Sequence, residues 1–280
     1  MAEPVRDQAL PPIVKQVRQL RTRAERERTG TYYIEGARIV AQAVQAGAEI
    51  TQGVIAPDLI KGTPHALDTV DALRSSGAPI VELSRTAFDS ISFKENLQGI
   101  GAVVRYHSDT LGDISPTEER VWVALDGVGN PGNLGAIMRT CDATGVAGLL
   151  LLGDTTDPYH PTAIRASMGS FYALQMIRAG FDEFVRWKLD HGFTVIGTSP
   201  TATEEYHQIT YPGCSVLLMG SERLGLSIHQ QAACDLLVKI PMVGTADSLN
   251  LGVATSVVLY EIFNQQRRNQ PRDEARRSAC

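Results

Sequence analysis

The sequence predicts two α/β domains, the second of which contains a parallel β-sheet covered by helices on both faces. In the second half, runs of consecutive apolar residues alternate with helical segments, as is typical of parallel strands buried on both faces. In the first hundred residues, short strand-like runs also alternate with helical segments. A stretch without apolar periodicity separates the halves, which places a domain boundary there.

The first domain is expected at residues 1–106, as a small α/β unit. Residues 11–28 are expected to form one helix with a strongly charged face, which ends before Gly30. The further elements of this domain are strands at 32–34, 50–56, 79–83 and 101–105 and helices at 35–46 and 64–75.

A linker is expected at residues 107–119, where Ser, Asp, Gly, Pro and Thr gather. The second domain is expected at residues 120–266. Its strands are predicted at 121–125, 148–152, 194–197, 215–219 and 236–240, and its helices at 134–144, 181–190 and 251–265. The polar segment 267–280 is expected to be a disordered tail.

Composition excludes several classes of protein. No apolar run is long enough to span a bilayer, and the first residues lack the apolar core of a signal peptide. Four cysteines in 280 residues do not form a disulfide framework, and neither they nor the six histidines show metal-ligand spacing. We therefore expect a cytoplasmic protein with no metal and no membrane partner.

The net charge of −5 argues mildly against nucleic-acid binding, but the basic residues are unevenly distributed. Between residues 15 and 28, Glu25 and Glu27 are outnumbered by six cations: Lys15, Arg18, Arg21, Arg23, Arg26 and Arg28. This excess can follow a phosphate backbone, or it can be a solvated helix face held by Arg–Glu pairs. The charge pattern alone leaves both interpretations open.

A glycine loop follows the first strand of the second domain. Residues 127–132 read Gly-Val-Gly-Asn-Pro-Gly, between a strand and a helix, and Asp154 follows the next strand. This pattern is typical of a dinucleotide site. Pro131 opposes that interpretation, because it removes an N–H from the turn that should face the pyrophosphate. A nicotinamide or flavin enzyme therefore remains an alternative.

Three ordered motifs favour a different interpretation. Residues 130–139 read Asn-Pro-Gly-Asn-Leu-Gly-Ala-Ile-Met-Arg. Residues 218–226 read Leu-Met-Gly-Ser-Glu-Arg-Leu-Gly-Leu, and residues 240–250 begin Ile-Pro-Met-Val-Gly and end Ser-Leu-Asn. These blocks resemble the SpoU/TrmH family of RNA 2′-O-ribose methyltransferases. One departure is the Leu251-Gly252 pair, where that family commonly has Val-Ser, and it bears on the packing of the last helix.

The resemblance implies a fold and an assembly. The C-terminal segment of the sheet is expected to pass through a loop and form a trefoil knot, although knots are rare. The family forms homodimers, and the last helix of this chain has apolar residues on more than one face, including Val253, Val257, Tyr260 and Phe263. We therefore expect a homodimer.

The resemblance also implies S-adenosylmethionine as cofactor and a site for it in the C-terminal loops. The cofactor residues are expected to be Thr198, Leu218, Gly220, Ile240, Met242 and Leu249. Apolar side chains line an adenosine slot, while Gly220 is expected to allow a close approach.

The catalytic set that the resemblance implies is Asn133, Arg139, Glu222, Ser248 and Asn250. The resemblance implies that Arg139 is either the base or the anchor of the target phosphate. Arginines are poor bases, so we expect Arg139 to orient the target hydroxyl and phosphate, and base action stays an open alternative. Asn133, Ser248 and Asn250 are expected to position Arg139 and the nucleotide. Glu222 is expected to hold the loops or to pair with an arginine. Simpler alternatives are a dipole contact for Arg139, an N-cap for Asn133 and capping by the 248–250 segment.

RNA contacts are expected from Arg165, Lys15, Arg18 and Arg38, and Arg165 is a candidate to serve a partner subunit's site. Tyr32 and Tyr33 are expected to be core residues rather than base-stacking platforms. The first domain favours 23S ribosomal RNA over transfer RNA as the substrate. A catalytically silent RNA-binding protein is the remaining alternative of a different class.

Overall fold

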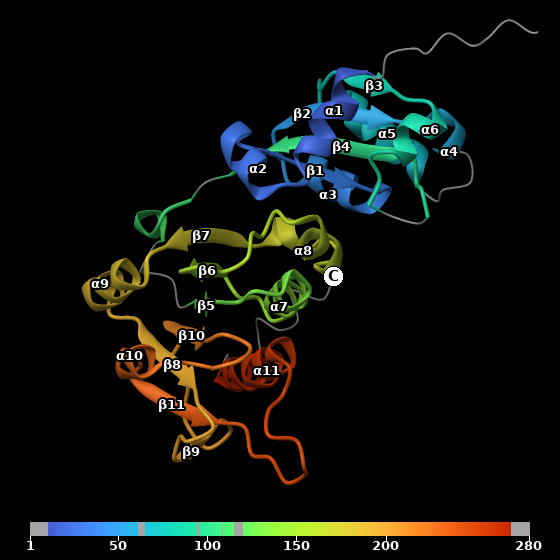
Figure 1. The fold of residues 1–280 in the computed structure, drawn as a ribbon. Coiled ribbons are helices and arrows are strands. Elements are labelled where there is room, and N and C mark those ends of the chain that lie inside the picture. Colours follow the sequence, from blue (N-terminus) through green and yellow to red (C-terminus); the bar gives the residue numbers. More distant parts are fainter. Residues whose placement is uncertain (1–10, 61–64, 94–95, 108, 115–119, 270–280) are drawn as a thin grey trace, which may run out of the picture. The chain divides into compact units, whose positions relative to one another are not determined.

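The chain divides into two compact units, each with its own β-sheet (Figure 1). The structure is a computed structural model that describes residues 11–60, 65–93, 96–107, 109–114 and 120–269. The first unit comprises Met1–His107 and Tyr159–Ile164, and the second comprises Ser108–Pro158 and Arg165–Cys280.

The first unit contains a four-stranded mixed sheet in the order β1-β4-β2-β3. Strand β4 is antiparallel to β1 and β2, whereas β3 is parallel to β2. The strands are β1 (Thr31–Glu35), β2 (Ile50–Ile55), β3 (Ile80–Glu82) and β4 (Ile100–Arg105). The helices are α1 (Pro12–Gln19), α2 (Arg23–Thr29), α3 (Ala37–Gln45), α4 (Pro57–Ile60), α5 (Ala66–Ser75) and α6 (Arg85–Asp89).

One face of this sheet is covered by α1 and α6, whose apolar side chains share a core with β1, β2 and β4. The face of α1 that is buried carries Ile13, Val14 and Val17. Tyr32 and Tyr33 are 2% and 3% exposed, so the prediction that they are core residues is confirmed.

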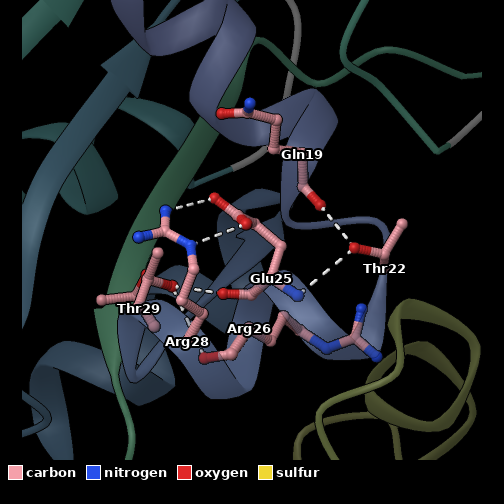
Figure 2. Close-up of polar contacts among 7 residues, drawn as sticks. Gln19, Thr22, Glu25, Arg26, Arg28 and Thr29 are labelled. Carbon is pink, nitrogen blue, oxygen red and sulfur yellow. Dashed lines mark hydrogen bonds and ion pairs between the residues drawn. The ribbon is translucent and has the colours of Figure 1, made fainter.

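The single helix predicted at 11–28 is wrong, because two helices meet at a corner there. The Thr22 hydroxyl accepts the Glu25 N–H (3.3 Å) and starts α2 (Figure 2). The guanidinium of Arg26, only 1% exposed, donates to the carbonyls of Leu20 (2.8 Å) and Arg21 (2.9 Å). Those bonds satisfy carbonyls that the end of α1 leaves without helical partners.

The second unit contains a seven-stranded sheet in the order β7-β6-β5-β10-β8-β11-β9, in which every neighbouring pair is parallel. The strands are β5 (Val121–Asp126), β6 (Gly148–Leu152), β7 (Gln175–Ala179), β8 (Thr194–Thr198), β9 (Glu204–Glu205), β10 (Ser215–Met219) and β11 (Leu236–Lys239). The helical elements are η1 (Leu111–Asp113), α7 (Pro131–Ala143), η2 (Ser170–Ala173), α9 (Phe181–His191), α10 (Ile228–Ala232) and α11 (Leu251–Asn269). Helix α8 (Pro161–Ala166) begins in the segment assigned to the first unit and ends in the second.

Helices lie on both sides of this sheet, with α9 and α10 on one side and α7 and α11 on the other (Figure 1). Phe184 and Trp187 of α9 pack with Val216 and Leu218 of β10 in one core. The predicted fold class, α/β with a parallel sheet in the C-terminal unit, is therefore confirmed.

The ends of the second unit differ from the sequence-based expectation. Leu111 and Ile114, inside the expected linker, are each 5% exposed and pack in the core of this unit. Helix α11 continues to Asn269, so the expectation of disorder is wrong for 267–269. The Arg267 guanidinium carbon lies over the Phe263 ring, 5.3 Å from its centroid, and basic residues suit a helix C-terminus. Residues 270–280 lie outside the described residues.

Within the described ranges, no helix combines the length and apolar character that crossing a membrane requires.

Candidate active site

The three motifs meet at one edge of the sheet in the second unit. Strands β5, β10, β8 and β11 are consecutive neighbours and run in the same direction. The segments that follow these strands therefore emerge together, at the carboxyl edge where open α/β sheets bind ligands. They include the glycine loop after β5, residues 220–226 after β10 and residues 240–250 after β11.

A cleft of about 290 Å³ lies among the segments that follow β8, β10 and β11. Its lining includes five of the six residues predicted to bind the cofactor: Thr198, Gly220, Ile240, Met242 and Leu249. Leu251 and Ala254, at the start of α11, also line it. The apolar walls and polar edges, at the lower end of the usual size of small-ligand sites, suit a nucleoside-sized molecule.

The sixth predicted cofactor residue, Leu218, does not line the cleft. Its side chain is 0% exposed and packs in the core shared with α9. Side chains alternate along a strand, so Met219 points to the opposite face and lines the cleft instead. The prediction for Leu218 is corrected on this ground.

Gly220 lines the cleft, but its missing side chain serves the protein backbone. Ser221 and Gly225 exchange backbone hydrogen bonds of 3.2 and 3.0 Å and close a tight hairpin. A Cβ on Gly220 would collide with the carbonyl of Gly225. Space for the hairpin, rather than for a ligand, therefore explains this glycine.

The glycine loop binds a carboxylate of its own chain. Glu222 accepts the N–H groups of Gly129 (3.1 Å) and Asn130 (3.0 Å). Partial burial is the largest single influence on the pKa of Glu222 and raises it. Hydrogen bonds from the backbone N–H groups of Gly129, Asn130 and Glu222 itself and from the Asn133 side chain lower it, and together they hold the pKa of Glu222 below its usual value. Glu222 is thus a fixed anion.

A chain of amide side chains extends from Glu222 across the site. Asn133 Nδ2 donates to Glu222 (3.3 Å), and Asn250 Nδ2 donates to Asn133 Oδ1 (3.0 Å). Asn250 Oδ1 accepts the Gly252 N–H (2.9 Å) at the start of α11. An ionised carboxylate can only accept hydrogen bonds, so Asn133 must turn its Nδ2 toward Glu222. Its Oδ1 then faces Asn250, which must turn its own Nδ2 toward Asn133. The chain joins the segments after β5, β10 and β11.

These contacts settle two of the simpler alternatives. The N-cap of α7 is Asn130, whose side chain accepts from Gly132 (2.7 Å) and Asn133 (3.3 Å), so Asn133 is not merely a cap. Asn250 does cap α11 through its oxygen, but its nitrogen bonds to Asn133. The N-cap role of Asn130 had a sequence signal, an asparagine directly before Pro131 at the first helical position.

Arg139 and Ser248 complete the predicted catalytic set. Arg139 is exposed on α7 and has no hydrogen bond or ion pair with any residue that the structure describes. Ser248 lines the cleft, and its hydroxyl contacts Asp247 at 3.4 Å. Arg139 is therefore available to an anion that the chain itself does not supply.

The predicted RNA contacts lie in both units. Lys15 and Arg18 are exposed on α1, and Arg38 is exposed on α3, all in the first unit. Arg18 Nε contacts the carbonyl of Ser90 at 3.4 Å. Arg165 is exposed on α8 in the second unit.

Of the two interpretations of the basic segment, helix α2 agrees with the one in which Arg–Glu pairs hold a solvent-exposed helix face. Arg28 pairs with Glu25 at 2.6 Å (Figure 2), and Arg23 pairs with Glu27 at 2.7 Å. Arg26 is buried and is not available to phosphate. The other three cations of the segment, Lys15 and Arg18 on α1 and Arg21 in the corner between the helices, are exposed.

A metal centre has no support in this part of the chain: among the described residues, no group of three or more His, Cys, Asp or Glu side chains is arranged to hold a metal ion.

Comparison with known proteins places this geometry in a family. The model of the SpoU rRNA Methylase family matches residues 120–260, half of the 280-residue chain. The chain belongs to the SpoU rRNA methylase family. A second model, the MRM3-like substrate binding domain, matches residues 11–102. The predicted resemblance is confirmed, and the dinucleotide-enzyme alternative is wrong, since Glu222 also occupies the loop amides that would face a pyrophosphate.

Curated relatives of this SpoU-family chain include two 23S ribosomal RNA methyltransferases. The 23S rRNA (guanosine-2′-O-)-methyltransferase RlmB of Vibrio cholerae is 32% identical over 73% of this chain and 85% of the relative. The 23S rRNA (guanosine(2553)-2′-O)-methyltransferase RlmP of Bacillus subtilis is 29% identical over 89% of this chain and 95% of the relative.

Solved structures agree with the family assignment. The AdoMet-bound rRNA methyltransferase from Sinorhizobium meliloti is 34% identical, with a TM-score of 0.84 over 94% of this chain and 97% of that one. The SpoU methyltransferase AviRb from Streptomyces viridochromogenes, in complex with the cofactor AdoMet, is 26% identical, with a TM-score of 0.83 over 93% and 100% of the two chains.

Proposed function

We propose that this chain transfers the methyl group of S-adenosylmethionine to a ribose 2′-hydroxyl of 23S ribosomal RNA. One observation carries the proposal: the hydrogen-bonded chain Glu222–Asn133–Asn250 connects the cleft to helix α7, which carries the unpartnered cation Arg139. The names of the relatives and the family assignment support the same activity.

The cleft residues fit the cofactor. Ile240, Met242, Leu249 and Leu251 supply apolar walls for an adenine ring, and Thr198 supplies a hydroxyl at the edge. When bound there, S-adenosylmethionine would supply an electrophilic methyl group. The methyl–sulfur bond would break as the bond to the ribose oxygen forms, which would leave S-adenosylhomocysteine, and the hydroxyl proton would pass to solvent. Glu222, at the border of the cleft, adds a negative charge that suits a cationic sulfonium.

The roles of the remaining residues follow from their contacts. Arginine keeps its proton in proteins, so Arg139 anchors the target phosphate and orients the ribose hydroxyl rather than accepting its proton. Asn133 and Asn250 hold α7 against the start of α11. Ser248, exposed on the rim of the cleft, is placed to contact the nucleotide. Alignment of this kind accelerates a displacement by removing orientational freedom.

Ribosomal RNA is favoured over transfer RNA by the extent of the matches. A solved structure titled for 2′-OH methylation of tRNA covers only 55% of this chain, at a TM-score of 0.50. The 23S rRNA relatives cover more, and RlmP extends over 89%. We assign RNA contacts to the first unit through Lys15, Arg18 and Arg38, and to Arg165 in the second. A cytoplasmic location is part of the proposal, because it agrees with activity on ribosomal RNA.

The protein is proposed to act as a homodimer whose sheet contains a trefoil knot. Helix α11 has an apolar stripe at Val253, Val257 and Tyr260, which follow helical spacing and share one face. Val253 and Tyr260 are 50% and 46% exposed in the single chain, and a second copy would cover them. The knot is supported by the family and by the position of β10, a late strand, between β5 and β8.

Methyl transfer from tritiated S-adenosylmethionine tests the function. In vitro transcribed 23S ribosomal RNA and total transfer RNA serve as separate substrates. The wild-type chain should label ribosomal RNA, and Arg139→Ala should reduce the rate roughly 100-fold because an oriented contact is lost. Arg186→Ala, at an exposed arginine of α9, is the matched control and should retain activity.

Other outcomes identify the alternatives. Label in transfer RNA alone would replace the ribosomal substrate by a transfer RNA. RNA binding without label in either substrate would indicate the catalytically silent RNA-binding protein.

A further inference from the structure

The position of the Arg139 side chain is set by the backbone of helix α7. Its guanidinium has no partner among the described residues, so the position and rotation of α7 determine where the cation can reach. A long side chain without partners samples several rotamers, and each depends on the helix backbone. The contacts that hold α7 are therefore relevant to the reaction.

Helix α7 packs along α11 in the same direction. Asn133 bonds to Asn250, and seven residues later the Thr140 hydroxyl lies 2.7 Å from the Ser256 hydroxyl. Between these two contacts Gly252, which is buried, faces Ala136, and a Cβ on Gly252 would lie 3.5 Å from that of Ala136. The two helices thus approach closely. We call this line of contact the α7–α11 seam; the Asn133–Asn250 hydrogen bond lies at one end of it and the Thr140–Ser256 hydrogen bond at the other.

The Thr140–Ser256 contact has a defined direction. Ser256 Oγ lies 2.7 Å from the carbonyl of Gly252, to which its single proton is donated. Thr140 then donates to Ser256, since its own-helix alternative, the carbonyl of Ala136, is longer at 3.3 Å. Each hydroxyl has one proton, so the two bonds form a single chain from α7 into α11.

Two different faces of helix α11 contact the cofactor cleft and helix α7. Leu251 and Ala254 line the cofactor cleft, whereas Gly252 and Ser256 face α7. The same helix therefore forms a wall of the cleft and a support for α7. Thr140 is adjacent to Arg139, so the seam ends one residue from the cation.

We propose that Thr140 and Ser256 are positioning residues, whose hydrogen bond fixes α7 on α11 and places Arg139 relative to the cofactor cleft. This inference rests on the proposed function. Neither residue touches the cleft, so their effect should appear in the methyl-transfer step and not in cofactor affinity.

Thr140→Val keeps the shape of the side chain and removes the hydroxyl. We expect kcat on 23S ribosomal RNA to fall roughly 10- to 100-fold, as expected for a displaced reacting group. The Kd of S-adenosylmethionine, measured by calorimetry, should stay within about twofold of wild type. Thr140→Ser should restore most of kcat. Ser256→Ala tests the bond from the other side, and the double variant Thr140→Val/Ser256→Ala should lose no more than either single variant.

Thr144→Val is the matched control. Thr144, the C-cap residue of α7, lies one turn beyond Thr140, is buried, and donates to the carbonyls of Thr140 and Cys141 in that helix. This variant removes the same group and should keep kcat. Melting temperatures of all variants, compared with kcat, separate a loss of placement from a loss of fold.

Three results would overturn the inference: unchanged kcat in Thr140→Val, an equal loss in Thr144→Val, or additive losses in the double variant. A wild-type chain that labels no RNA would overturn the proposed function, and this inference with it.

Discussion

Glu222 occupies the position in the glycine loop where a bound phosphate would lie in a dinucleotide site. The loop amides of Gly129 and Asn130 are thereby satisfied within the chain. The same carboxylate orients Asn133, and through it Asn250. An ionised Glu222 is therefore the fixed end of the hydrogen-bonded chain.

The charge of Glu222 predicts a pH-dependent stability difference. The pKa of Glu222 is below the ordinary 4.5, so its ionised form stabilises the fold fully above about pH 4.5, and that contribution is lost as pH falls through the folded value. At neutral pH, Glu222→Gln should lower the free energy of unfolding by about 1–2 kcal/mol, because hydrogen bonds to charges are strong but partly screened here.

Urea denaturation of wild type and Glu222→Gln at several pH values measures this difference. It should be constant from neutral pH to about pH 5.5 and should shrink below about pH 4.5. If the difference in unfolding free energy between wild type and Glu222→Gln grows as the pH falls, the pKa of Glu222 is not lowered in the folded protein.

At the residue scale, motif positions were easier to predict than side-chain directions. The three blocks correctly bring Asn133, Glu222 and Asn250 into contact. Leu218 was misplaced because a strand buried on both faces has no polar residue to mark which neighbour faces the cleft. The role of Gly220 depends on a collision with Gly225 that no spacing reveals.

At the element scale, periodicity predicted the long buried strands but not those at the sheet edge. Strand β7 (Gln175–Ala179) contains Gln and Arg, because only one side of it pairs with a neighbouring strand, and it lacks the apolar run that marks β6. The corner between α1 and α2 did have a local signal, Thr22 followed three residues later by Glu25. The charged periodicity across 11–28 obscured it.

The corner between α1 and α2 predicts a large effect for Arg26. Arg26→Met keeps the apolar stem but leaves the carbonyls of Leu20 and Arg21 without these donors. We expect a loss of about 2–4 kcal/mol in the stability of the first unit, since buried polar groups would lose their partners. The Kd of S-adenosylmethionine should be unchanged, because the cleft belongs to the second unit.

Arg28→Met is the control at this corner. Arg28 is exposed and its pair with Glu25 is screened by solvent, so its loss should lower the stability far less than the loss of Arg26. Urea denaturation followed by circular dichroism compares the two variants. Equal stability of Arg26→Met and Arg28→Met would show that the buried guanidinium is not a structural contact.

At the scale of the whole molecule, composition and alternation were sufficient for the fold class, because a parallel sheet covered on both faces requires continuous apolar strands. Composition and alternation do not predict the order of the strands in the sheet. Strand β10 lies between β5 and β8, although β8 precedes it in the chain, and only side-chain packing selects that order. The apolar residues of α11 could be read from the sequence, but the fold was needed to show that Val253 and Tyr260 stay exposed in the single chain.

The apolar stripe of α11, formed by Val253, Val257 and Tyr260, predicts how two chains assemble. A dimer through α11 buries Val253 and Tyr260, which are about half exposed in one chain. Val253→Lys would place a charge in that contact and should convert a dimer of twice 30.3 kDa into a monomer in sedimentation equilibrium. Leu189→Lys introduces the same charge at an apolar residue 70% exposed on α9, and this variant should remain dimeric. If both variants sediment as wild type, the stripe is not the interface, and a monomeric wild type would remove the homodimer altogether.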